Sequence, residues 1–138
     1  MQAQTMQVQM DGQIKSFQGL ESDSFDPASL WERVNGDMDL LRDLVRLFAL
    51  EYPELLLNIQ SAIEKGLFGD VQRLSHKLKG SALQFSGKLA VAAAGRLEEM
   101  GRTEALDGAG QILATLRFEV VRLMQSLEAM ISCEWPLM

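Results

Sequence analysis

The chain has 138 residues, of which 47% are apolar and 23% charged, and this is enough for one domain around a single buried core. Its formal net charge of -6 at pH 7 argues against nucleic acid as a partner, because a phosphate backbone attracts basic surfaces. No apolar run approaches the roughly 20 residues that cross a bilayer, and the N-terminal residues lack the basic start and apolar stretch of a secretory signal. We therefore expect no membrane insertion and a cytoplasmic location.

Residues 1–24 are rich in Gln, Ser, Gly and Asp without helical or alternating apolar periodicity, which predicts a flexible leader or linker. The folded domain is expected over residues 25–138. At its start, Asp26 is suited to cap a helix and Pro27 to occupy the first helical position. The apolar residues that follow predict a short helix, ended by residues 35–37: Leu30, Trp31 and Val34.

A second helical pattern follows, in which apolar residues recur at helical spacing: Leu40, Leu41, Leu44, Val45, Leu47 and Phe48. Pro53 removes a backbone donor and is expected to kink or interrupt this helix. The pattern resumes at Leu55 and is closed by Gly66 and Gly69.

Three further boundaries are predicted after residue 69. Asp70 is placed to cap a third helix from Val71 to about Phe85, ended by residues 86–87. A fourth helix is expected over residues 88–100, with Gly101 as its C-cap. From about residue 106 a long final helix is marked by apolar residues at helical spacing: Ile112, Leu113, Leu116, Val120, Leu123, Leu127 and Ile131. No strand-like alternation appears, so the predicted fold is all-α, an antiparallel four-helix bundle with a short additional N-terminal helix.

The third helix carries the only histidine of the chain, His76. At about 100° per residue, the buried stripe of this helix comprises Val71, Leu74, Leu78, Ala82 and Phe85. His76 then points roughly 150° away from that stripe, toward solvent. Its neighbours on the outward face are Gln72, Lys79, Gly80 and Leu83.

A lone exposed histidine on a helix is most often a solvated residue without a function. Three features argue for a function of His76. Gly80 costs about 1 kcal/mol relative to Ala in a helix interior, and its missing side chain would let another protein approach His76. Lys79 supplies a cation within one turn, although a single lysine is usually ordinary surface charge. Leu83 is apolar on the polar face, which indicates a docking patch or else a single exposed leucine of no consequence.

The segment His76-Lys77-Leu78-Lys79-Gly80-Ser81-Ala82 resembles the signature of the histidine-containing phosphotransfer (HPt) family. The resemblance extends over about residues 25–131, and it includes Leu97 to Arg102 as the end of the next helix. One departure is Ser86, because the family often has Gly at that position, and it concerns the turn at the end of the helix.

By this resemblance, His76 is the phosphoacceptor and Lys79 orients or neutralises the phosphoryl group. Gly80 gives clearance for the partner, and Gln84 matches a polar position that often assists. Docking of the partner is expected to involve three further positions on the same helix: Gln72, Arg73 and Leu83.

The implied function is that of a phosphocarrier in a two-component phosphorelay, without an ATP site of its own. The implied partners are response-regulator receiver domains and a hybrid sensor histidine kinase. Mg²⁺ is expected on the receiver, and this chain is expected to need no cofactor or metal.

Three alternatives remain at this point. A non-phosphorylated helical adaptor would make Gly80 and Leu83 accidental. The phosphoacceptor domain of a chemotaxis-type histidine kinase is close in motif. The dimerisation helices of a catalytic histidine kinase also expose a histidine, but they usually have an acidic residue directly after it, where this chain has Lys77.

Overall fold

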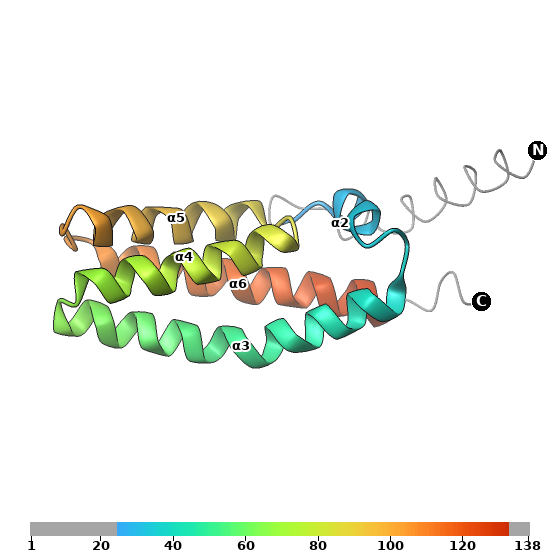
Figure 1. Ribbon diagram of the computed structural model, residues 1–138, viewed down its shortest axis with the longest axis horizontal. Helices are drawn as coiled ribbons and strands as arrows, with labels where there is room; N and C mark the ends of the chain where they lie inside the picture. The colour runs from blue at the N-terminus through green and yellow to red at the C-terminus, as the bar shows by residue number, and fades with distance from the viewer. Residues whose placement is uncertain (1–24, 133–138) are drawn as a thin grey trace, which may run out of the picture.

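The computed structural model describes residues 25–132, which form a short helix and four long ones. The long helices lie side by side, and the short helix α2 sits at one end of them (Figure 1). Their bounds are α2 Pro27–Arg33, α3 Met38–Lys65, α4 Phe68–Gln84, α5 Lys88–Arg102 and α6 Ala109–Ser132. The prediction of an all-α helical bundle with a short N-terminal helix is confirmed, whereas the leader predicted over residues 1–24 lies outside the described residues.

The long helices pack in a ring, in which α3 contacts α4, α4 contacts α5, α5 contacts α6, and α6 returns to α3. Every helix turns one apolar stripe inward, since apolar burial is the main driving force for packing. The stripe predicted on α4 is buried, with each of its members at most 8% exposed: Val71, Leu74, Leu78, Ala82 and Phe85. This burial fixes the rotation of α4 about its axis, and so the direction in which its polar residues point.

The ends of the first two helices follow the predicted capping chemistry. The Asp26 carboxylate accepts a hydrogen bond from the backbone N–H of Ser29 at 3.2 Å, and Pro27 opens α2. Gly66 ends α3 in the left-handed conformation at φ +66°, as expected of a glycine C-cap.

Pro53 is expected from the sequence to kink or interrupt its helix. α3 is not interrupted but continues for 28 residues, and it bends near its middle (Figure 1), as the kink alternative predicts. Leu55 and Ile59 extend the buried stripe beyond Pro53, and this packing outweighs the lost backbone hydrogen bond. α4 begins at Phe68 rather than after Asp70, which instead lies in the first turn, where a carboxylate favours the positive end of the helix dipole.

Gly101 is not a C-cap, because α5 continues to Arg102 and is capped by Thr103. Instead it brings two helices together. A Cβ at this position would lie 2.6 Å from the backbone nitrogen of Gln72 and 2.7 Å from the carbonyl oxygen of Phe68. The backbones of α4 and α5 therefore touch here, and only glycine leaves room for that contact. The final helix also starts later than expected, at Ala109.

The turn between α4 and α5 keeps a left-handed residue although serine stands there. Ser86 has φ +57°, the conformation that glycine adopts without strain. Its hydroxyl contacts the Ser29 hydroxyl at 3.4 Å, and Arg33 donates hydrogen bonds to the carbonyl oxygens of Leu83 and Gln84. These hydrogen bonds hold α2 against the C-terminal end of α4.

Candidate functional site

His76 stands on the outward face of α4, and its side chain is 67% exposed. This confirms the helical-wheel prediction. Gly80, one turn later, is exposed, and a Cβ built there meets no atom within 4 Å. The space beside the imidazole is therefore open.

A carboxylate from the neighbouring helix contacts both His76 and Lys79 of α4. Glu98 of α5 places Oε2 2.6 Å from His76 Nδ1, and its Oε1 accepts a hydrogen bond from Lys79 Nζ at 2.5 Å. An ionised carboxylate only accepts hydrogen bonds, so this contact assigns the proton of a neutral imidazole to Nδ1. The lone pair is then on Nε2, which has no partner among the described residues.

The negative charge of Glu98 is stabilised by its contacts with Lys79 and His76. The hydrogen bond from Lys79 lowers the pKa of the Glu98 carboxyl, burial opposes this, and the contact with His76 lowers the pKa further. The net shift is downward, so Glu98 is ionised throughout the neutral range. It can thus orient the imidazole and stabilise positive charge on it.

A glycine in α5 makes this contact possible. The backbones of α4 and α5 touch at Gly101, and this lets α5 lie close enough to α4 for the Glu98 side chain to reach both His76 and Lys79. Gly95 faces the stem of Lys79, but a Cβ there would lie 3.7 Å from Lys79 Cδ, an ordinary contact distance, so a small side chain would also fit. The site therefore depends on the close packing of α4 against α5.

Within residues 25–132, the other predicted site residues make no hydrogen bond or ion pair to this cluster. Leu83 is 54% exposed on the same side of α4. Arg73 pairs with Asp70 at 3.5 Å, and Gln72 is half-buried beside α5. Gln84 is exposed two turns beyond His76, and its backbone carbonyl accepts from Arg33. Their assignment to assistance or docking stays a prediction.

The chain matches the family model of the Hpt domain over residues 43–132, which is more than half of its length. It belongs to the Hpt domain family. The match indicates a phosphotransfer-related role in two-component signalling, where Hpt domains interact with receiver domains. No similar curated protein and no similar solved structure was found. Among residues 25–132, no helix is both long and apolar enough to cross a membrane.

Sequence reasoning missed Glu98 in this Hpt domain, although a signal for it exists. α4 and α5 are antiparallel and joined by a tight turn at residues 86–87, so residues at similar distances from the turn lie side by side. His76 comes ten residues before Ser86, and Glu98 comes eleven after Gly87. Counting outward from the turn would have placed a carboxylate near the histidine.

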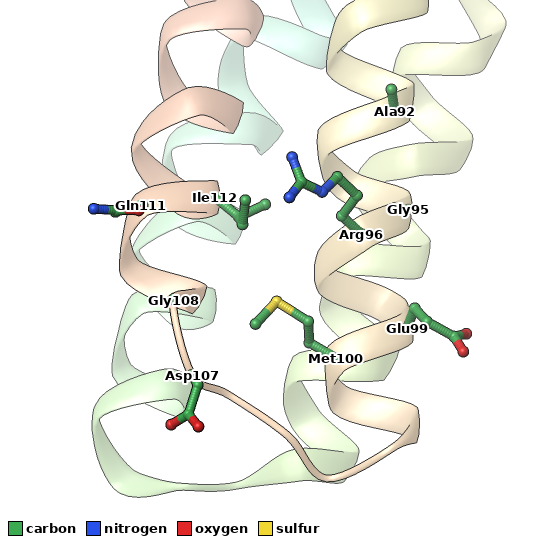
Figure 2. Close-up of a pocket in the computed structure, with 9 residues that line it drawn as sticks. All are labelled: Ala92, Gly95, Arg96, Glu99, Met100, Asp107, Gly108, Gln111 and Ile112. Atoms are coloured by element: carbon green, nitrogen blue, oxygen red, sulfur yellow. The ribbon is translucent and has the colours of Figure 1, made fainter.

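A hollow between α5 and α6 lies apart from this site (Figure 2). Met100 and Ile112 form its apolar floor, Arg96 extends over it from α5, and its volume is about 590 Å³. None of the residues that line it is a histidine. The candidate functional site is instead the open surface around His76.

Proposed function

We propose that this Hpt domain is a phosphocarrier, in which His76 accepts a phosphoryl group from the aspartyl phosphate of one receiver domain and passes it to another. One observation carries the proposal: the imidazole is exposed, and Glu98 engages Nδ1, which leaves Nε2 as the nucleophile. Phosphoryl transfer needs mainly positioning and charge stabilisation, and an oriented imidazole supplies one reacting partner.

The transfer balances without a base on this chain. The Nε2 lone pair forms a bond to phosphorus while the bond from phosphorus to the aspartyl oxygen breaks, and the carboxylate leaves with that electron pair. The ring then carries phosphate on Nε2 and a proton on Nδ1. Positive charge develops on the ring, and the Glu98 carboxylate at 2.6 Å stabilises it. The same step in reverse returns the phosphoryl group to an aspartate.

Lys79 has two uses in this scheme. Its ammonium group holds Glu98 in place, and it brings a positive charge within one helical turn of the phosphoryl oxygens. Mg²⁺ and the remaining charge neutralisation would come from the receiver, so the chain would need no cofactor and no ATP site of its own.

The receiver would dock on the face of α4 that carries His76 and on the adjoining face of α3. Glu51 of α3 pairs with Lys77 of α4 at 3.9 Å, so the antiparallel helices place Leu47 at the level of Gly80. Leu47 is 59% exposed and Leu83 is 54% exposed, which gives apolar contacts on either side of the clearance at Gly80. Gln84 would lie at the edge of this contact.

Cations on α4 would contact an acidic partner surface by exchanging their present ion pairs. Arg73, Lys77 and Lys79 pair with carboxylates of this chain, so the positive charge of this face is balanced in the free domain: Asp70, Glu51 and Glu98 respectively. Ion pairs on a surface contribute little to stability, so an acidic partner can replace one of them at little cost. A receiver phosphorylated on aspartate has that acidic character, and a hybrid sensor histidine kinase is a natural source of one.

The test is transfer of radiolabelled phosphate from phosphorylated receiver domains to the chain. We expect the wild type to acquire an acid-labile, base-stable label and His76→Gln to acquire none. The variant should keep its thermal stability within about 0.5 kcal/mol, because an exposed helical residue contributes little. Label retained in His76→Gln would exclude this residue as the acceptor.

The same assay separates the alternatives. A helical adaptor takes no label from any donor. A phosphoacceptor domain of a chemotaxis-type kinase is labelled by an ATP-dependent kinase domain and fails to take phosphate from receivers. Transfer of phosphate from a receiver to this chain, and from this chain to a receiver, supports the phosphorelay.

A further inference from the structure

An exposed apolar surface remains on the side of the bundle formed by α3 and α6. We define the α3–α6 patch as Leu50, Leu57, Phe118 and Val121, whose exposed fractions are 79%, 64%, 60% and 38%. α6 packs against α3 and α5 across the ring from α4, so this side is separate from the face that presents His76. Apolar side chains of this size gathered on one face mark an interaction surface.

The register of the two helices sets which residues share a level. Arg42 of α3 donates to the Ile131 carbonyl of α6, and Arg117 of α6 donates to Gln60 of α3. The helices are therefore antiparallel and paired along most of their length. Between these two fixed points, Leu57 lies at the level of Phe118.

The same register places two opposite charges at one level at the other end of the patch. Arg46 of α3 lies at the level of Glu128 of α6, because Arg46 follows Arg42 by about one turn and Glu128 precedes Ile131 by about one turn in the antiparallel helix. Both side chains are exposed. Arg46 makes only a 3.6 Å surface pair with Asp43, and Glu128 has no partner among the described residues.

We propose that the α3–α6 patch is a homodimer interface, in which α3 of one copy lies antiparallel on α6 of the other. A two-fold axis parallel to the helices exchanges the two helices and keeps each residue at its level. Leu57 then meets Phe118 of the second copy, and Arg46 meets Glu128 of the second copy, each pair occurring twice. A second copy of this chain thus satisfies both the apolar and the charged parts of the surface, which is the self-complementarity that a two-fold interface requires.

The proposal does not rest on phosphotransfer, and the arrangement leaves both copies of His76 accessible. The patch spans only two helices, and a stable dimer typically buries about 800 Å² on each partner. We therefore expect a reversible dimer with a dissociation constant in the micromolar range.

The first experiment is sedimentation equilibrium of the full chain across that range. We expect the average mass to rise with concentration from monomer toward dimer. Leu57→Glu should weaken association at least about tenfold, because it puts charge into the centre of the contact. Leu47→Glu is the matched control, since Leu47 lies on the same helix with similar exposure but on the face adjoining α4. A wild type that is monomeric at every concentration, or equal weakening by both variants, would overturn the proposal.

The second experiment tests the arrangement by exchanging charges. Arg46→Glu and Glu128→Arg should each weaken the dimer, and the double variant should restore it. A dimer that the double variant fails to restore would overturn the placement of α3 on α6. The phosphotransfer assay on Leu57→Glu keeps the two proposals apart, because this variant should accept phosphate at the wild-type rate while Leu47→Glu should not.

Discussion

Replacement of Gly80 by Gln should raise the stability of the chain and slow phosphotransfer. The site is exposed inside α4, and a Cβ there would meet no atom within 4 Å, so a side chain brings no clash. Removing a helix-interior glycine should then stabilise the chain by up to about 1 kcal/mol. For a domain of this size that corresponds to a rise of about 4 °C in the melting midpoint.

Transfer should change in the opposite direction. The new side chain would occupy the open space one turn from His76, where the receiver must bring its phosphoryl group in line with Nε2. A misplacement of about 1 Å at the reacting atoms slows such a step by up to roughly a hundredfold. We expect Gly80→Gln to slow phosphoryl transfer by at least about tenfold.

Two measurements on each variant decide the matter: the melting midpoint and the single-turnover rate of transfer from a receiver that labels the wild type. Gly110→Gln is the control, because Gly110 is also exposed and open at Cβ but lies at the start of α6. It should leave the transfer rate unchanged. Unchanged transfer in Gly80→Gln, together with the higher midpoint, would refute the clearance argument.

Three other substitutions test the cluster and its packing. Glu98→Gln should slow transfer by about tenfold without unfolding the chain, and nitrogen chemical shifts should show His76 losing its preference for a proton on Nδ1; an unchanged tautomer would contradict this. Lys79→Met should raise the pKa of Glu98 in a carboxyl NMR titration, because the lysine is the main cause of its depression. A carboxyl group whose pKa is depressed in the folded state stabilises the fold at pH values above its unfolded pKa of about 4.5, and this stabilisation is lost as the pH falls through its folded pKa. Lys79→Met should therefore also lose less stability in acid than the wild type does. Gly101→Ala should destabilise the chain by about 1 to 3 kcal/mol or more in denaturant unfolding, because its Cβ would fall 2.6 Å from the Gln72 backbone nitrogen; a neutral effect would show that α4 and α5 can separate there.

Features that depend on one helix alone could be predicted from the sequence. The spacing of Leu74, Leu78 and Ala82 defines the buried side of α4, and that side determines where His76 points. The Asp26 cap and the Gly66 terminus are likewise local, because each satisfies backbone groups within a turn.

Features that depend on two helices could not be predicted in this way. Pro53 left a kink or an interruption open because its local effect is unfavourable, and it is core packing on both sides that keeps α3 continuous. Gly101 resembled a terminator but serves the contact with α4. Glu98 stood unnoticed beside Glu99, because only the register of α5 against α4 shows which of the two meets His76. Pairing between helices is a tertiary property, and a helical wheel does not contain it.

The most direct test of the central claim is the position of the phosphoryl group on the phosphorylated chain. A phosphorus–proton correlation NMR spectrum of the chain after transfer from a receiver identifies the bonded ring nitrogen. We expect the phosphorus on Nε2 of His76, with the Nδ1 proton retained in its hydrogen bond to Glu98. Phosphorus on Nδ1, or on any other residue, would contradict the account.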